Sequence, residues 1–120
     1  YVKHIIDSGL LEIVPLSCMR GRTFKNTFII ADEMQNSSPA QMKMLLTRLG
    51  EDSKMVVLGD ITQNTQTPNG LKDLITKITD YYNVESFYYD MNNDGISLVG
   101  LKGKDVQRSE LVRKILNIYE

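Results

Sequence analysis

The sequence contains one cysteine in 120 residues, Cys18, so no disulfide can form within the chain. Neither a CxxC motif nor the Cys/His spacing of a zinc site surrounds it. This pattern favours a reducing compartment and predicts that Cys18 is a small apolar packing residue. A chain of this length buries about two thirds of the surface that its unfolded form exposes, so we expect one domain without covalent cross-links.

The sequence also lacks an excess of one charge and any long apolar run. Fourteen Lys and Arg residues stand against fifteen Asp and Glu, a net charge of −1. This balance excludes nucleic-acid binding through net charge alone but allows a local basic patch. No apolar run approaches the ~20 residues of a membrane-spanning helix. The start, YVKHIIDSGLLEIV, lacks the apolar core and cleavage site of a signal peptide. The sequence therefore predicts a soluble, cytoplasmic domain without membrane contacts.

The first thirty residues alternate apolar and polar segments. Apolar residues at helical spacing before Gly9 predict a short helix, which opens in mid-pattern without a cap, as expected of a fragment of a longer protein. The β-prone residues Leu10–Pro15 predict a strand, and the polar, basic residues 19–26 predict a loop. The apolar run TFIIA at residues 27–31 is typical of a strand covered on both faces, as in a parallel sheet.

The helix expected next is well marked at its start. Ser38 and Gln41 have the Ser-x-x-Gln spacing of a capping box, and Pro39 suits the first helical position. Gly50 predicts the end of this helix. Its apolar face comprises Met42, Leu45, Leu46 and Leu49.

The order of strand and helix then repeats. KMVVLGD at residues 54–60 predicts a second buried strand, and LKDLITKITDYY at residues 71–82 predicts a second helix. Strands that alternate with helices at this spacing favour βαβ units. The expected fold class is α/β, a three-layer sandwich with a mostly parallel sheet.

The last third of the chain is less regular. Residues 84–101 predict two strands around an NNDG turn, and residues 105–120 predict a closing helix capped by Asp105. A calcium loop competes with the hairpin, because Asp90, Asn92, Asp94 and Gly95 match the early positions of an EF-hand. Leu101 stands where that loop needs a bidentate glutamate, so the hairpin is preferred.

Two adjacent carboxylates, Asp32 and Glu33, end the apolar run of the first buried strand. Ligands of parallel α/β sheets bind at the carboxyl ends of the strands, so acids there can hold a cation and a water. A solvated turn explains the same two acids, and alone it is the favoured interpretation. The second strand also ends on an acid, Asp60, followed by Gln63, so we expect two neighbouring strands to bring polar groups to one edge of the sheet.

The segment PLSCMRGRTFKNTFIIADEMQNSSPAQMKMLLTRLGEDSKMVVLGDITQ closely resembles the PhoH-like proteins, P-loop ATPases related to the core of superfamily-one helicases. The family pattern runs MRGRT, a hydrophobic strand, DEAQN, TxxQMKMxLTRxG and SKMVxxGDxxQ. The closing DVQRSELVRKILNIYE resembles the family's DVVRHPLVxxIxxxYE, so the likeness covers most of the chain. Residues 84–95 depart from the pattern as an apparent inserted hairpin. The resemblance implies a RecA-like P-loop NTPase fold that binds ATP and magnesium.

The resemblance also implies roles for single residues. Asp32 would hold magnesium, and Glu33 would polarise the water that attacks the γ-phosphate. Gln35, the glutamine of DEAQ, would sense the nucleotide, with Met34 in place of the family's alanine. Gln63, the glutamine of GDxxQ, would contact the γ-phosphate.

Three arginines complete the set that the resemblance implies. Arg108 matches the arginine of the closing DVVRH and would stabilise charge on the transferred phosphoryl group, within one subunit or across a homo-oligomer. Arg20 and Arg22, of MRGRT, would contact phosphate or nucleic acid. A surface ion pair is the competing interpretation for each arginine.

The sequence shows no phosphate-binding GxxxxGK[ST] loop, which in the family lies upstream. We therefore expect residues 1–120 to be the C-terminal part of one PhoH-like NTPase domain and to hydrolyse ATP poorly alone. The leading hypothesis is an ATP-hydrolysing domain, with single-stranded RNA or DNA as an expected partner. The alternative is a non-catalytic nucleotide or nucleic-acid binding module that keeps the fold without turnover.

Overall fold

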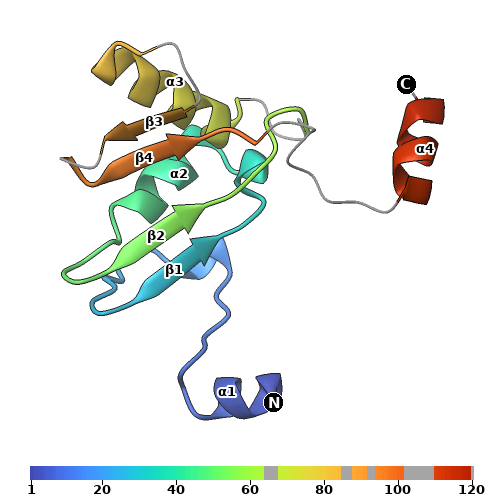
Figure 1. The fold of residues 1–120 in the computed structure, drawn as a ribbon. Helices are drawn as coiled ribbons and strands as arrows, with labels where there is room; N and C mark the ends of the chain where they lie inside the picture. The colour runs from blue at the N-terminus through green and yellow to red at the C-terminus, as the bar shows by residue number, and fades with distance from the viewer. Residues whose placement is uncertain (64–67, 85–87, 92–93, 102–109, 120) are drawn as a thin grey trace. The chain divides into compact units, whose positions relative to one another are not determined.

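The computed structural model describes residues 1–63, 68–84, 88–91, 94–101 and 110–119, with the backbone alone at 88–91. The chain forms two compact units, Tyr1–Tyr81 and Tyr82–Glu120. Figure 1 shows the elements in chain order. They are the helix α1 (Val2–Asp7), the 3₁₀ helix η1 (Leu16–Cys18), the strand β1 (Phe28–Ala31), the 3₁₀ helix η2 (Met34–Asn36), the helix α2 (Pro39–Leu46), the strand β2 (Lys54–Val57), the helix α3 (Gly70–Tyr82), the strands β3 (Tyr88–Met91) and β4 (Ile96–Val99), and the helix α4 (Glu110–Tyr119).

The first unit is built on a parallel pair of strands. β1 and β2 lie side by side, with Phe28 opposite Lys54 and Ala31 opposite Val57 (Figure 1). Backbone hydrogen bonds continue past the strand ends, because Leu58 N–H donates to the Ala31 carbonyl at 2.8 Å and Met34 N–H donates to the Leu58 carbonyl at 3.0 Å. The carboxyl ends of both strands therefore meet at one edge, which confirms the α/β class and the predicted common edge.

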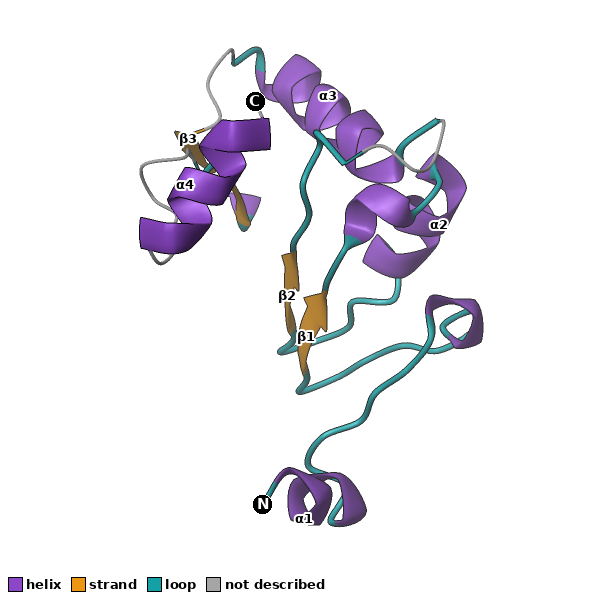
Figure 2. Ribbon diagram, turned by 90° about the vertical axis from the view of Figure 1, so that its right-hand side faces the viewer, coloured by secondary structure: helices purple, strands orange, loops and turns teal. Residues whose placement is uncertain are grey.

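The helices α2 and α3 lie on one side of this strand pair (Figure 2). A hydrophobic core forms there, and its buried members are Met19, Ala31, Met34, Met42, Leu45 and Leu71. On the other face, Phe28 and Ile30 of β1 are 63% and 65% exposed. Cover on both faces of this strand was predicted, but within the described residues only one face is covered. The three-layer arrangement stays a prediction.

The start of α2 is as the sequence predicts, but its end is not. Ser38 Oγ accepts a hydrogen bond from Gln41 N–H at 3.2 Å, and Gln41 Oε1 accepts one from Ser38 N–H at 2.9 Å, which completes the capping box. The helix ends at Leu46 with Thr47 as its C-cap, before Gly50. Gly50 instead brings two segments together, because its N–H donates to the Phe24 carbonyl at 2.7 Å and a Cβ there would meet the same oxygen at 2.5 Å.

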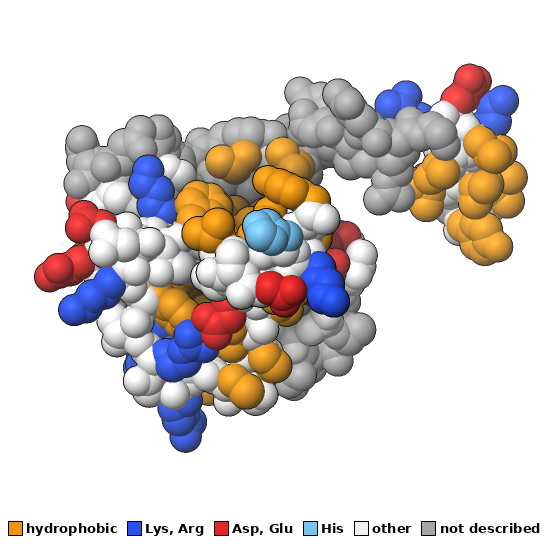
Figure 3. Space-filling model, turned by 90° about the horizontal axis from the view of Figure 1, so that it is seen from below, with side chains coloured by type: hydrophobic (Ala, Val, Ile, Leu, Met, Phe, Trp, Pro, Cys, Tyr) orange, Lys and Arg blue, Asp and Glu red, His pale blue; other side chains and the backbone are white. Residues whose placement is uncertain are grey.

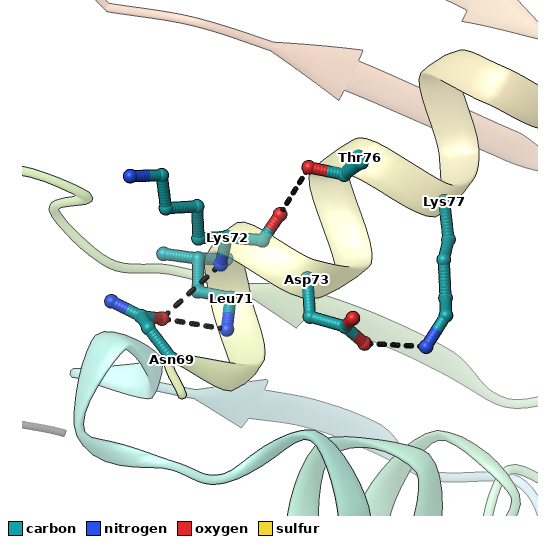
Figure 4. Close-up of polar contacts among 6 residues, drawn as sticks. All are labelled: Asn69, Leu71, Lys72, Asp73, Thr76 and Lys77. Carbon is teal, nitrogen blue, oxygen red and sulfur yellow. Dashed lines mark hydrogen bonds and ion pairs between the residues drawn. The ribbon is translucent and has the colours of Figure 1, made fainter. Parts of the chain in front are cut away.

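The helix α3 is fixed at its start by Asn69, a cap that the sequence reasoning missed (Figure 4). The side-chain oxygen of Asn69 accepts hydrogen bonds from the N–H groups of Leu71 and Lys72, at 2.9 and 3.1 Å. One turn later, Lys77 Nζ lies 2.8 Å from Asp73 Oδ2 in an i,i+4 ion pair. Leu71 is buried, and three further apolar residues at helical spacing, Leu74, Ile75 and Ile78, are partly buried, so they form the inward face of this helix.

Two predictions near the N-terminus are wrong. Residues Leu10–Pro15 form no strand, because within the described part of the chain no neighbouring strand pairs with them, and β-propensity without a partner does not make a strand. Cys18, expected as a packing residue, is exposed at the end of η1. The first helix is confirmed as α1, and Gly9 follows it with φ 79°, the left-handed conformation that commonly ends a helix.

The second unit contains a hairpin and a helix. β3 and β4 pair antiparallel, from Tyr88 opposite Val99 to Met91 opposite Ile96, which confirms the hairpin. An EF-hand needs helices where these strands lie. Tyr82 Oη donates to Asp94 Oδ2 at 2.9 Å. The predicted cap Asp105 lies outside the described residues. The helix α4 exposes apolar side chains such as Leu111 and Ile118 (Figure 3). Among the described residues, no helix is long and apolar enough to cross a membrane.

Candidate functional site

The turn after β1 carries the two acids in a constrained backbone. Glu33 has φ 56° and ψ 38°, the left-handed region, which costs a residue with a side chain about 1–2 kcal/mol. Its N–H donates to Asp32 Oδ1 at 2.8 Å. Glu33 is also the N-cap of the 3₁₀ helix η2, which begins at the next residue, Met34. Backbone strain of this kind clusters at functional sites, and here both carboxylates are exposed.

Buried residues fix this turn from the inside. Met34 lies in the core, and Ser37, also buried, donates through Oγ to the Met34 carbonyl at 2.6 Å. Gln35 is 1% exposed. The exposed acids are thus carried on a turn that packing holds in one conformation.

Gln35 joins the two strand ends. Its Nε2 donates to Glu33 Oε2 at 2.5 Å, and its Oε1 accepts a hydrogen bond from Asp60 N–H at 3.1 Å. The buried amide therefore links the acid that follows β1 to the backbone that follows β2.

The turn after β2 is exposed and closed by its own polar groups. Asp60 Oδ1 accepts hydrogen bonds from Thr62 N–H at 2.9 Å and Thr62 Oγ at 2.6 Å. Gln63 Nε2 donates to Asp60 Oδ2 at 3.4 Å, a long contact. The hydrogen bonds from Thr62 are the main cause that lowers the pKa of Asp60 below its ordinary value.

The structure thus brings together five of the residues that the sequence singles out. A chain of hydrogen bonds runs from Glu33 through Gln35 to Asp60 and on to Gln63, and Asp32 adjoins it. No sequence pattern indicated this connection, because it joins residues 25 positions apart through a buried side chain.

The two arginines of MRGRT take no part in the hydrogen bonds described for this network. Arg22 binds both carboxylate oxygens of Glu12, at 2.9 and 3.1 Å, and its guanidinium lies 4.7 Å from the centre of the Phe24 ring. The hydrogen bond lowers the pKa of Glu12 and raises the pKa of Arg22. This is the surface ion pair that the sequence left open for Arg22. Arg20 is exposed, and Arg108 lies outside the described residues.

The charges around the site allow a cation but supply no complete cage for it. Within the described part of the chain, no group of three or more His, Cys, Asp or Glu side chains converges. On the face drawn in Figure 3, the described Lys and Arg side chains are interspersed with Asp and Glu and do not form one positive surface. A metal at this edge would need ligands from a bound substrate or water.

The sequence model of the PhoH family, described as PhoH-like protein, matches residues 1–120 of the chain. The chain belongs to this family. The match covers the whole sequence, so it includes both turns of the candidate site.

The family's members include longer proteins. A PhoH-like protein of Bacillus subtilis (strain 168) is 40% identical over 120 residues, which are 100% of this chain and 35% of that relative. A PhoH-like protein of Synechocystis sp. is 42% identical over 123 residues, 99% of this chain and 34% of the relative. Protein PhoH of Escherichia coli (strain K12) is 40% identical over 113 residues, 94% and 29%. The chain thus spans about a third of these relatives' lengths.

Gly59 also shapes the site and was not among the residues predicted from the sequence. A Cβ at this position would lie 2.5 Å from Leu71 Cδ2 and 2.7 Å from Gln35 Oε1. The absence of a side chain lets the backbone after β2 reach the amide of Gln35. The available signal was a glycine directly before the acid at a strand end, which often marks a close backbone approach.

Proposed function

We propose that this chain supplies the magnesium-holding and water-activating part of an ATP-hydrolysing P-loop domain. The observation that carries the proposal is the hydrogen-bonded link between the acid pair after β1 and the turn after β2, at the carboxyl edge of a parallel strand pair. Ligands of α/β sheets bind at this edge, and phosphoryl transfer depends on groups held there in fixed positions.

Each residue at the edge has a role that its chemistry suits. Glu33, an exposed carboxylate held by Gln35, would accept a proton from the attacking water. Gln63 would contact the γ-phosphate and, through Asp60, remain linked to the turn. Arg108 would stabilise charge on the transferred group, and Arg20 would contact phosphate. Arg22 would first have to leave its ion pair with Glu12.

The donor set fits magnesium bound with a nucleotide. Mg²⁺ in such sites takes one or two carboxylates and completes its shell with water and substrate phosphates. Asp32 matches this requirement, because it is exposed and held through Oδ1 by the N–H of Glu33. The absence of a cluster of three acidic, His or Cys side chains among the described residues agrees with a site completed by substrate. When bound, magnesium would neutralise charge on the phosphates.

Coupling to single-stranded RNA or DNA is a further part of the proposal and rests on the family resemblance. The interspersed charges on the face in Figure 3 favour a local contact over a broad basic surface. Stimulation of ATP turnover by single-stranded RNA or DNA tests this part.

Glu33→Gln in the full-length protein tests the central role. The amide oxygen of the new side chain can still accept the hydrogen bond from Gln35, so the turn is kept while the base is lost. We expect kcat for ATP hydrolysis to fall by about 10²- to 10⁴-fold with nucleotide affinity unchanged. Steady-state hydrolysis and titration with a fluorescent ATP analogue measure the two quantities.

Glu51→Gln is the matched control, because Glu51 is an exposed carboxylate in the turn after α2. It should leave both quantities unchanged. Wild-type turnover by Glu33→Gln would reject Glu33 as the base. A wild-type protein that binds ATP without hydrolysing it would instead establish the non-catalytic module.

A further inference from the structure

Gln35 is the largest fully buried side chain in the described structure, and it is polar. Burial of an amide costs free energy unless its hydrogen-bonding groups find partners. Here the donor end binds the Glu33 carboxylate and the acceptor end binds the Asp60 N–H. Both ends of the amide are therefore engaged inside the protein, on two different turns.

The two partners require opposite chemistry from one side chain. A carboxylate needs a donor and a backbone N–H needs an acceptor, and an uncharged amide supplies both at once. An ionised glutamate would accept from Asp60 but repel Glu33. A leucine or methionine would make neither hydrogen bond, and an asparagine is one methylene shorter. Glutamine thus satisfies both contacts at this position.

Packing holds the amide in place. Gly59 leaves room for Gln35, since a Cβ there would lie 2.7 Å from its Oε1 and 3.2 Å from its backbone nitrogen. Leu71 of α3 borders the same space, because its Cδ2 would lie 2.5 Å from that Cβ. The amide has little freedom to turn away from either partner.

We propose that Gln35 is a positioning residue that holds the Glu33 carboxylate in its reactive orientation and couples it to the turn of Asp60 and Gln63. Gln35 acts through these partners and does not touch the nucleotide, which revises the sensor role implied by resemblance. The catalytic consequence rests on the proposed function, whereas the link between the two turns does not. A shift of the Asp60 turn when Gln63 meets a phosphate would reach Glu33 through this amide.

Gln35→Glu in the full-length protein tests the proposal through pH. A protonated glutamate donates through its hydroxyl and accepts through its carbonyl, so it reproduces both contacts of glutamine. Once ionised, it faces Glu33. The other charged groups on these turns, Asp32 and Asp60, are also acidic and Leu71 is apolar. These charges and the burial raise the pKa of the new carboxyl, against the opposing hydrogen bond from Asp60 N–H.

Two readouts follow from this chemistry. The ratio of kcat for the variant to kcat for the wild type should approach one at low pH and fall by about tenfold per pH unit above the raised pKa. The folded-state pKa lies above the unfolded value, so the variant keeps its stability below the unfolded pKa and loses it as pH rises through the folded one. Its melting temperature should therefore fall behind the wild type between about pH 5 and 8, a range above the ordinary Glu pKa of ~4.3.

Gln41→Glu is the matched control, because Gln41 is exposed and its side-chain oxygen only accepts a bond from Ser38 N–H. It should show neither pH effect. Gln35→Met, which cannot titrate, should lower kcat at every pH and leave nucleotide affinity unchanged.

The two proposals fail in different ways. Absence of ATP turnover in the wild type would overturn the proposed function, while the melting temperatures would still test the link. If the melting temperature of Gln35→Glu follows that of the wild type over that same pH range, the link between the two turns is overturned. If Gln35→Met keeps the wild-type kcat but binds nucleotide more weakly, Gln35 touches the nucleotide, and its role as a positioning residue is overturned.

Discussion

The turn after β1 and the turn after β2 end neighbouring strands at the same edge, but they are stabilised in different ways. The first contains a left-handed residue, Glu33, and is anchored by the buried side chains of Met34 and Gln35. The second is exposed and closed by hydrogen bonds from Thr62 and Gln63 to Asp60. Gln35 is the contact that joins them.

Because of this difference, we expect the first turn to be more rigid than the second. A catalytic base must be held in one geometry, and packing on the core supplies this for Glu33. A group that meets a phosphate must be able to move, and local hydrogen bonds in an exposed turn open more easily than a packed core. Substitutions in each turn therefore test whether packing stabilises the first turn and local hydrogen bonds stabilise the second.

Gly59→Ala should destabilise the fold most among these substitutions, because it forces a Cβ into the space of Leu71 and Gln35. We expect a loss of about 1–3 kcal/mol in the free energy of unfolding, typical of overpacking. Urea denaturation measures it. In the background of Gln35→Ala the loss should shrink, because part of the clash is gone. If the losses of stability caused by Gly59→Ala and by Gln35→Ala are strictly additive, Gly59 does not pack on Gln35.

A smaller effect is expected at the left-handed position of the first turn. Glycine adopts this conformation without a steric cost, so Glu33→Gly should be more stable than Glu33→Ala by about 1 kcal/mol. Both variants lose the carboxylate equally, so their difference isolates the backbone. Thermal unfolding of the pair checks this, and an alanine variant as stable as the glycine variant would argue against strain at Glu33.

The smallest effect is expected in the second turn and depends on pH. The pKa of Asp60 is lowered in the folded state, so its stabilising contribution is present above the unfolded pKa and is lost as pH falls through the folded one. Asp60→Asn keeps an oxygen acceptor but cannot titrate. Its melting temperature should depend less on pH than that of the wild type below about pH 4. If the melting temperatures of Asp60→Asn and the wild type depend on pH in the same way below about pH 4, Asp60 is not the source of the acid dependence.

Local signals in the sequence predicted the elements that local chemistry controls. The Ser38–Gln41 capping box and Pro39 marked the start of α2 because their bonds lie within four residues. The NNDG signal located the β3–β4 hairpin for the same reason. The strand expected at Leu10–Pro15 failed because a strand depends on a partner, which a segment's own composition does not supply.

The candidate site likewise combines features set by the local sequence with features that depend on contacts between distant segments. The sequence alone places Asp32 and Glu33 after one strand and Asp60 and Gln63 after the other, because each apolar run marks where its strand ends. The burial of Gln35 between the two turns, the room that Gly59 leaves for it, and the ion pair of Arg22 with Glu12 follow instead from tertiary packing. Gln35 and Asp60 lie 25 positions apart in the chain and Arg22 and Glu12 lie ten apart, so folding is what brings each pair into hydrogen-bonding range.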